Sequence, residues 1–226
     1  MRIHVRTAAI VLSSAVLGSA LLAAPAAAAP DYVLNASGIQ QTVLRAQLPT
    51  SLGAWRQNIY FANDNSAPTV CQSSTGEAVS LPTAGLGGLV GYEVNKSIDG
   101  AVYLYQYKDQ AAAAAALAAL QAINCPDDAK IGEDGPATAV PADQASDFTD
   151  AAKTSFVSSI TYKMQGTPVT TETRTTQIGL AVVQTQVTAS GKAASQKGIG
   201  RAGSLNKRWH RQAVAAYVAF GSGSSR

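Results

Sequence analysis

Residues 101–107, which read Ala-Val-Tyr-Leu-Tyr-Gln-Tyr, carry the clearest structural signal in this chain. Tyr103, Tyr105 and Tyr107 alternate with Val102 and Leu104. Because successive side chains of a strand point to opposite faces, this pattern predicts a strand with one aromatic and one aliphatic face.

An alanine-rich helix is expected directly after this strand, over Gln110 to Ile123, with Asp109 as its cap. Cys125 and Pro126 follow its end. Its apolar stripe is predicted to consist of Ala113, Ala116, Leu117 and Leu120.

The remaining segments predict further strands and two more helices. A short helix is expected over Gly38 to Ala46, capped by Ser37, and a last helix over Lys207 to Phe220. Strands are expected at Gly87 to Val94, Phe156 to Met164, Thr170 to Thr176 and Ile178 to Val187, a turn at Ser97 to Gly100, and a loop over 189–206. This element order predicts an α+β fold, a mostly antiparallel sheet with flanking helices in a single domain.

The N-terminal segment has the pattern of a secretory signal peptide. Arg2 and Arg6 precede an apolar run from Ala8 to Ala24, and the small residues Ala26 and Ala28 suit the −3 and −1 positions of a cleavage site. We therefore expect residues 1–28 to be removed and the protein to be secreted; retention as a membrane anchor is the alternative. We expect a loose leader over 29–36, the folded domain over 37–220 and a flexible tail over 221–226.

The charge is balanced overall but unevenly distributed. The chain has 17 Lys and Arg against 14 Asp and Glu, so nothing favours nucleic acid as a partner. Acids gather between Gln121 and Asp150, whereas Lys192 to Arg226 contains bases and no acid. The basic end either only aids solubility or contacts an anionic envelope surface through Lys207, Arg208 and Arg211. In the last helix, Trp209, Ala213, Ala216 and Phe220 are expected to pack on the sheet.

The chain has 2 cysteines, Cys71 and Cys125. An even count in an exported protein predicts one structural disulfide. A reactive pair is disfavoured because there is no C-x-x-C spacing, and two cysteines do not make a zinc site. No metal or other cofactor is expected.

No catalytic motif stands in a suitable context. Beyond the signal segment the one histidine is His210, beside Trp209 and Arg211, and we expect it to be exposed or half-buried on a helix rather than catalytic. The stretch 198–203 matches G-x-G-x-x-G in letters, but polar residues precede it and no acid follows about 20 residues on, so it predicts a flexible loop.

The tyrosine face is the best candidate for binding. If Tyr103, Tyr105 and Tyr107 lie on an uncovered side of the sheet, they offer a platform for sugars, lipids or peptides. The alternative is that these rings belong to the core, as buried aromatics usually do.

The succession of Leu48-Pro49, Gly53-Ala54-Trp55, the 101–107 strand, Lys108-Asp109-Gln110-Ala111 and an alanine helix ending at Cys125 resembles the PknH-like extracellular sensor domain family. The similarity spans roughly Gln40 to Phe220. It implies an antiparallel sheet with flanking helices, a ligand-sized cleft and no catalysis. The kinase-borne members have two disulfides, whereas this chain allows one.

These observations lead to one expectation and one alternative. We expect a secreted, non-enzymatic, sensor-like domain that binds a small molecule or a cell-envelope component. The alternative is a secreted hydrolase whose site is assembled only in the fold; a buried carboxylate pair, or a serine in contact with His210, would favour it.

Overall fold

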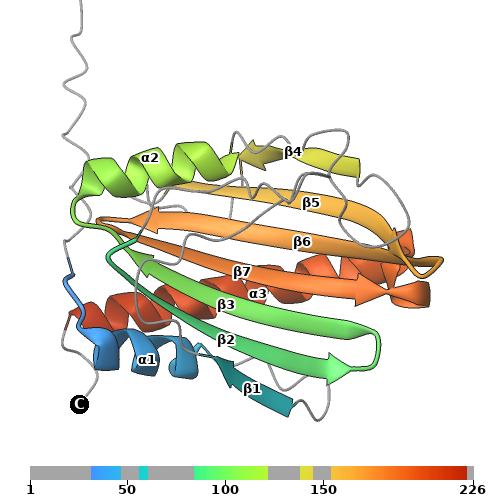
Figure 1. Cartoon of the computed structure of the whole chain (residues 1–226), viewed down its shortest axis with the longest axis horizontal. Helices are drawn as coiled ribbons and strands as arrows, with labels where there is room; N and C mark the ends of the chain where they lie inside the picture. Colours follow the sequence, from blue (N-terminus) through green and yellow to red (C-terminus); the bar gives the residue numbers. More distant parts are fainter. Residues whose placement is uncertain (1–31, 47–55, 61–83, 122–137, 145–153, 223–226) are drawn as a thin grey trace, which may run out of the picture.

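The structure is a computed structural model, and it describes residues 32–46, 56–60, 84–121, 138–144 and 154–222. Seven strands form a single sheet in the order β1-β2-β3-β7-β6-β5-β4 (Figure 1), and every neighbouring pair is antiparallel. The strands are β1 (Arg56–Tyr60), β2 (Leu86–Asn95), β3 (Ile98–Gln106), β4 (Thr138–Gln144), β5 (Thr154–Met164), β6 (Thr167–Ile178) and β7 (Ala181–Ser190).

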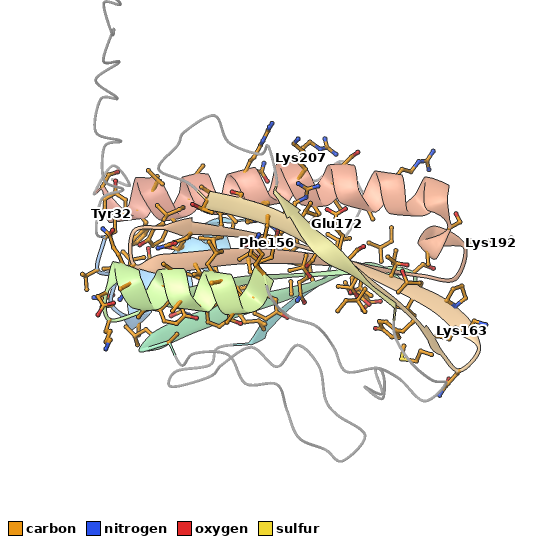
Figure 2. All side chains as sticks on the ribbon, turned by 90° about the horizontal axis from the view of Figure 1, so that it is seen from above. Tyr32, Phe156, Lys163, Glu172, Lys192 and Lys207 are labelled. Carbon is orange, nitrogen blue, oxygen red and sulfur yellow. The ribbon has the colours of Figure 1, made fainter. Side chains whose placement is uncertain are left out.

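The described helices lie on both faces of the sheet. They are α1 (Ala36–Arg45), α2 (Gln110–Gln121), the short 3₁₀ helix η2 (Gly191–Ala194) and α3 (Gln196–Gly221). Helices α1 and α3 pack on one face and α2 packs on the other (Figures 1 and 2). The predicted α+β fold, a mostly antiparallel sheet with flanking helices, is confirmed.

The 101–107 signal is confirmed with small shifts at its ends. Val102 and Leu104 point toward α1 and α3, whereas Tyr105 and Tyr107 point toward α2. The turn before the strand lies at Lys96 and Ser97, not at Ser97 to Gly100, and Gly100 belongs to β3. Gly100 is required there because a Cβ would approach the Trp209 ring to 2.8 Å.

Helix α2 follows its sequence prediction closely. The Asp109 carboxylate accepts a hydrogen bond from the Ala112 N–H at 2.7 Å, which is the expected N-terminal cap. The four residues of the predicted stripe, Ala113, Ala116, Leu117 and Leu120, are all buried. The helix ends at Gln121 within the described residues, and Cys125 lies outside them.

Helix α1 begins two residues earlier than expected, with a different cap. The Asn35 side chain, not Ser37, accepts from the Gly38 N–H at 2.8 Å. Ile39 and Val43 are buried against the sheet. The approach is close because Gly88 of β2 lacks a side chain: a Cβ there would lie 2.6 Å from the Ile39 side chain.

The predicted loose leader over 29–36 is wrong for the part that the structure describes. Leu34 is buried in the core, and the Gln106 side chain accepts a hydrogen bond from its backbone N–H and donates one to its carbonyl. The Tyr32 ring lies edge-on to Tyr217 with ring centres 5.8 Å apart, and the Tyr217 hydroxyl donates to the Tyr32 carbonyl. The predicted tail also starts too early, since Gly221 is still in α3.

The predicted loop over 189–206 is also wrong. Strand β7 continues to Ser190, η2 follows, and α3 begins at Gln196. Glycine, serine and lysine suggested a loop, but Ala202 and Leu205 are buried against the sheet, and this packing outweighs the weak local helix propensity. Trp209 and Ala213 are buried as predicted, and Ala216 and Phe220 are partly buried beside them.

Candidate functional site

Tyr103 and Tyr105 of β3 and Tyr107, which directly follows this strand, share one face, as predicted, but they are not equally exposed. Tyr105 and Tyr107 are buried in a cluster with α2, Phe156 and Val182, and Figure 2 shows Phe156 between α2 and the sheet. Burial raises the pKa of Tyr105, and it raises that of Tyr107 to about 12. The open three-ring platform is therefore wrong for these two residues, which belong to the core.

Tyr103 lies at the margin of this cluster and is half-buried. Its ring is stacked on that of Tyr105, with centres 6.1 Å apart and planes 13° apart. Its hydroxyl donates to the Gln186 side-chain oxygen at 3.1 Å. Burial raises the pKa of Tyr103, so its hydroxyl is a neutral donor and acceptor near neutral pH.

Neutral polar side chains continue from Tyr103 across the same face. Register places Thr188 and Gln186 of β7 beside Thr171 and Thr173 of β6, and Thr173 beside Ser158 of β5. All are half-buried, and the Thr171 and Thr188 hydroxyls are 2.9 Å apart. We call this surface the polar sheet face; its members are Tyr103, Ser158, Thr171, Thr173, Gln186 and Thr188.

Two carboxylates stand at the end of this face. Asp99 of β3 lies opposite Glu93 of β2 in the strand register, and both residues are exposed. Partial burial and the charge of Glu93 raise the pKa of Asp99. This pair is not the buried carboxylate pair that would favour a hydrolase. Among the described residues there is no cluster of His, Cys, Asp and Glu that could hold a metal ion.

His210 lies on the other face of the sheet and is fully buried, so the expectation of an exposed or half-buried histidine is wrong. Its Nε2 lies 2.7 Å from the Thr176 hydroxyl and its Nδ1 lies 3.0 Å from the Thr185 hydroxyl. The Thr176 hydroxyl also pairs with Ser155 at 2.6 Å. Both ring nitrogens thus bond threonines inside the core, where a substrate has no access.

A second polar group links α3 to β6. The Arg174 side chain donates to Glu172 at 2.7 Å, and the Asn206 amide donates to the Glu172 backbone carbonyl at 3.0 Å. Figure 2 shows Glu172 between the sheet and α3. A Cβ at Gly203 would collide with the Glu172 carboxylate. The last glycine of the G-x-G-x-x-G letters therefore makes room for a carboxylate, a role that needs no nucleotide.

The predicted envelope-contact residues all lie on α3. Arg208 and Arg211 are exposed and Lys207 is half-buried, and Figure 2 shows Lys207 on the side of α3 away from the sheet. The other predicted pair, Cys71 and Cys125, lies outside the described residues, so the disulfide stays a prediction.

Comparisons with protein-family models, with curated proteins and with solved structures found no match. The resemblance to PknH-like sensor domains therefore stays a prediction. Within the described ranges, no helix is both long enough and apolar enough to span a membrane.

Sequence reasoning found Tyr103 but missed the polar residues around it. Ser158, Thr171, Thr173, Gln186 and Thr188 come from three strands, and only the strand order brings them together. One pattern in the sequence points to this face. Thr171 and Thr173 alternate with charged Glu172 and Arg174, and this two-residue alternation places the two threonines on the same side of a strand.

Proposed function

We propose that this protein is a secreted, non-enzymatic binding domain, and that the polar sheet face holds its ligand, a small molecule or a component of the cell envelope. The observation that carries this proposal is Tyr103, a half-buried ring at the edge of the α2 cluster whose hydroxyl is aligned by Gln186. An aromatic surface beside fixed neutral donors and acceptors is typical of ligand sites that recognise shape and hydrogen bonding.

The chemistry of the face favours an uncharged polyhydroxyl ligand such as a sugar unit. Threonine, serine and glutamine side chains both donate and accept hydrogen bonds, as sugar hydroxyls do. The ring of Tyr103 offers an apolar surface for the C–H side of a sugar ring. The acids of this face, Asp99 and Glu93, stand at its end, where Asp99 lies opposite Thr188 in the strand register.

The test is a binding screen of the purified protein against mono- and oligosaccharides, followed by NMR chemical-shift mapping. Gln186→Leu removes the partner of the Tyr103 hydroxyl, and we expect about tenfold weaker binding, which corresponds to about 1.4 kcal/mol. The matched control is Gln212→Leu, because Gln212 is exposed on α3 at the opposite side of the sheet. Equal affinities of the two variants, or no binding by the wild type, would contradict the proposal.

The hydrolase alternative has its own test. We expect no turnover with ester, peptide or glycoside substrates, because the His210 nitrogens are bonded to Thr176 and Thr185 inside the core. His210→Gln keeps a hydrogen-bonding side chain at the position. Turnover by the wild type that disappears in a folded His210→Gln variant would show that the protein is an enzyme.

A further inference from the structure

The basic residues of α3 form a longer row than the sequence prediction allowed. Helix α3 has 26 residues and includes Lys197, Arg201, Lys207, Arg208 and Arg211, with no Asp or Glu. Because it begins at Gln196, Arg201 joins the predicted basic residues on a continuous helix. At a rise of 1.5 Å per residue, Arg201 and Arg211 lie about 15 Å apart along the axis.

The side of α3 that faces away from the sheet carries Arg201, Lys207 (Figure 2), Arg208 and Arg211. Arg201, Arg208 and Arg211 are exposed, as are Ser204 and Ala215, whereas Trp209 and Ala213 are buried. Residues 201, 204, 208, 211 and 215 follow the three- and four-residue steps of one helix face. We call Arg201, Lys207, Arg208 and Arg211 the basic row.

Helix stability does not explain this arrangement. Like charges three or four residues apart, as in Arg208 and Arg211 or Lys207 and Arg211, disfavour a helix by a few tenths of a kcal/mol. The helix dipole favours acids in the first turn and bases in the last turn, yet α3 has no acid in its first turn and no base in its last. Arg201 lies in the second turn, and Lys207, Arg208 and Arg211 lie near the middle of the helix, too far from either end for the helix dipole to account for them.

We propose that the basic row binds a linear polyanion, an extended polymer that carries phosphate or carboxylate groups. Three members of the row are arginines, whose planar guanidinium groups bind such oxygen pairs in a bidentate manner. A straight row of charges about 15 Å long matches several successive charges of an extended chain better than one small anion.

A polymer fits this face better than a lipid bilayer. A helix that lies on a membrane carries large apolar side chains that enter the acyl region. The other exposed positions of α3 include Ser204, Gln212 and Ala215, which provide no such anchor. The proposal is independent of the polar sheet face, which lies on the other side of the sheet.

The probe is fluorescently labelled inorganic polyphosphate, and its binding to the purified protein is measured by anisotropy. If four charges are neutralised, the logarithmic salt slope is about −2.8, so affinity falls about 50-fold when salt rises fourfold. Arg201→Gln/Arg208→Gln/Arg211→Gln should lose most of the binding. This variant should melt within a few degrees of the wild type, because the three side chains that it replaces are exposed on α3.

The matched control is Lys96→Gln/Lys108→Gln/Lys163→Gln, which makes the same change in net charge at exposed positions outside α3. We expect this variant to bind polyphosphate like the wild type within about twofold, since the bases it removes are outside the basic row. An equal loss in both triple variants would show that only net charge matters and would overturn the proposal. So would a lack of salt-dependent binding by the wild type, or tighter binding to phosphatidylglycerol vesicles than to polyphosphate.

Discussion

Replacing Gln106 by Met should release the N-terminal segment from the core. The Gln106 side chain accepts from the Leu34 N–H at 2.7 Å and donates to the Leu34 carbonyl at 2.9 Å. Both residues are buried, with Leu34 8% and Gln106 7% exposed. Met has a similar length but can replace neither hydrogen bond, so both backbone groups of Leu34 lose their partner.

The structure sets the size of this effect. An unpaired buried polar group costs about 1–3 kcal/mol, and slight exposure of Leu34 lets water recover part of it. We expect a loss of about 3 kcal/mol in the free energy of unfolding, which lowers the Tm by about 6–12 °C in a domain of this size. Denaturant unfolding and thermal melting measure both quantities.

Hydrogen exchange locates the effect. Leu34 and the first turn of α1 should exchange faster in Gln106→Met, while the centre of β7 stays protected. The control Gln212→Met, on the exposed side of α3, should stay within about 0.5 kcal/mol of wild type. A stability loss below about 1 kcal/mol, or unchanged exchange at Leu34, would show that the two hydrogen bonds between Gln106 and Leu34 do not stabilise the fold as expected.

Two further predictions concern the cysteines and the buried tyrosines. Intact-mass analysis after alkylation should find Cys71 and Cys125 bonded, and reduction should lower stability by up to about 4 kcal/mol; two thiols that react without reductant would contradict this. Burial raises the pKa of Tyr92 and Tyr107 to about 12, above the ordinary value of 10.0, so their contribution to stability is fully present below pH 10 and is lost as the pH rises through 12. Tyrosinate absorbance from these residues should therefore appear near pH 12 or together with unfolding, and its appearance near pH 10 in folded protein would refute their burial.

The sequence predicts the centre of the sheet well because its signals there are local. Alternation in β3 and the Asp109 cap of α2 depend only on neighbouring residues, and both are confirmed. The β6–β7 boundary fails for a related reason. Gly179, with a φ of 56°, makes the turn, but Leu180 is apolar and buried, so the run from Ile178 to Val183 resembles one strand.

The errors at α3 and at the candidate site come from contacts between distant segments. Residues 196–206 include three glycines, Gly198, Gly200 and Gly203, which disfavour a helix, and the sheet supplies the apolar surface against which Ala202 and Leu205 are buried. The alternating pattern of residues 101–107 treats Tyr103, Tyr105 and Tyr107 alike. Tyr103 differs from Tyr105 and Tyr107 only through where α2 lies, which the alternation along β3 does not encode.

The buried polar contacts of α3 explain why its basic row faces outward. The Trp209 indole N–H donates to the Ala46 carbonyl at 2.6 Å, His210 bonds two strand threonines, and Asn206 donates to the Glu172 backbone carbonyl. Each partner has a fixed position on another element. A shift of α3 by one residue would leave these buried groups unpaired and would turn Arg211 toward the threonines that now bond His210, at a cost of several kcal/mol. The role of the buried His210 is therefore structural. Together with Trp209 and Asn206 it fixes the rotation of α3 about its own axis. This rotation keeps Arg201, Arg208 and Arg211 in solvent on one side of the helix.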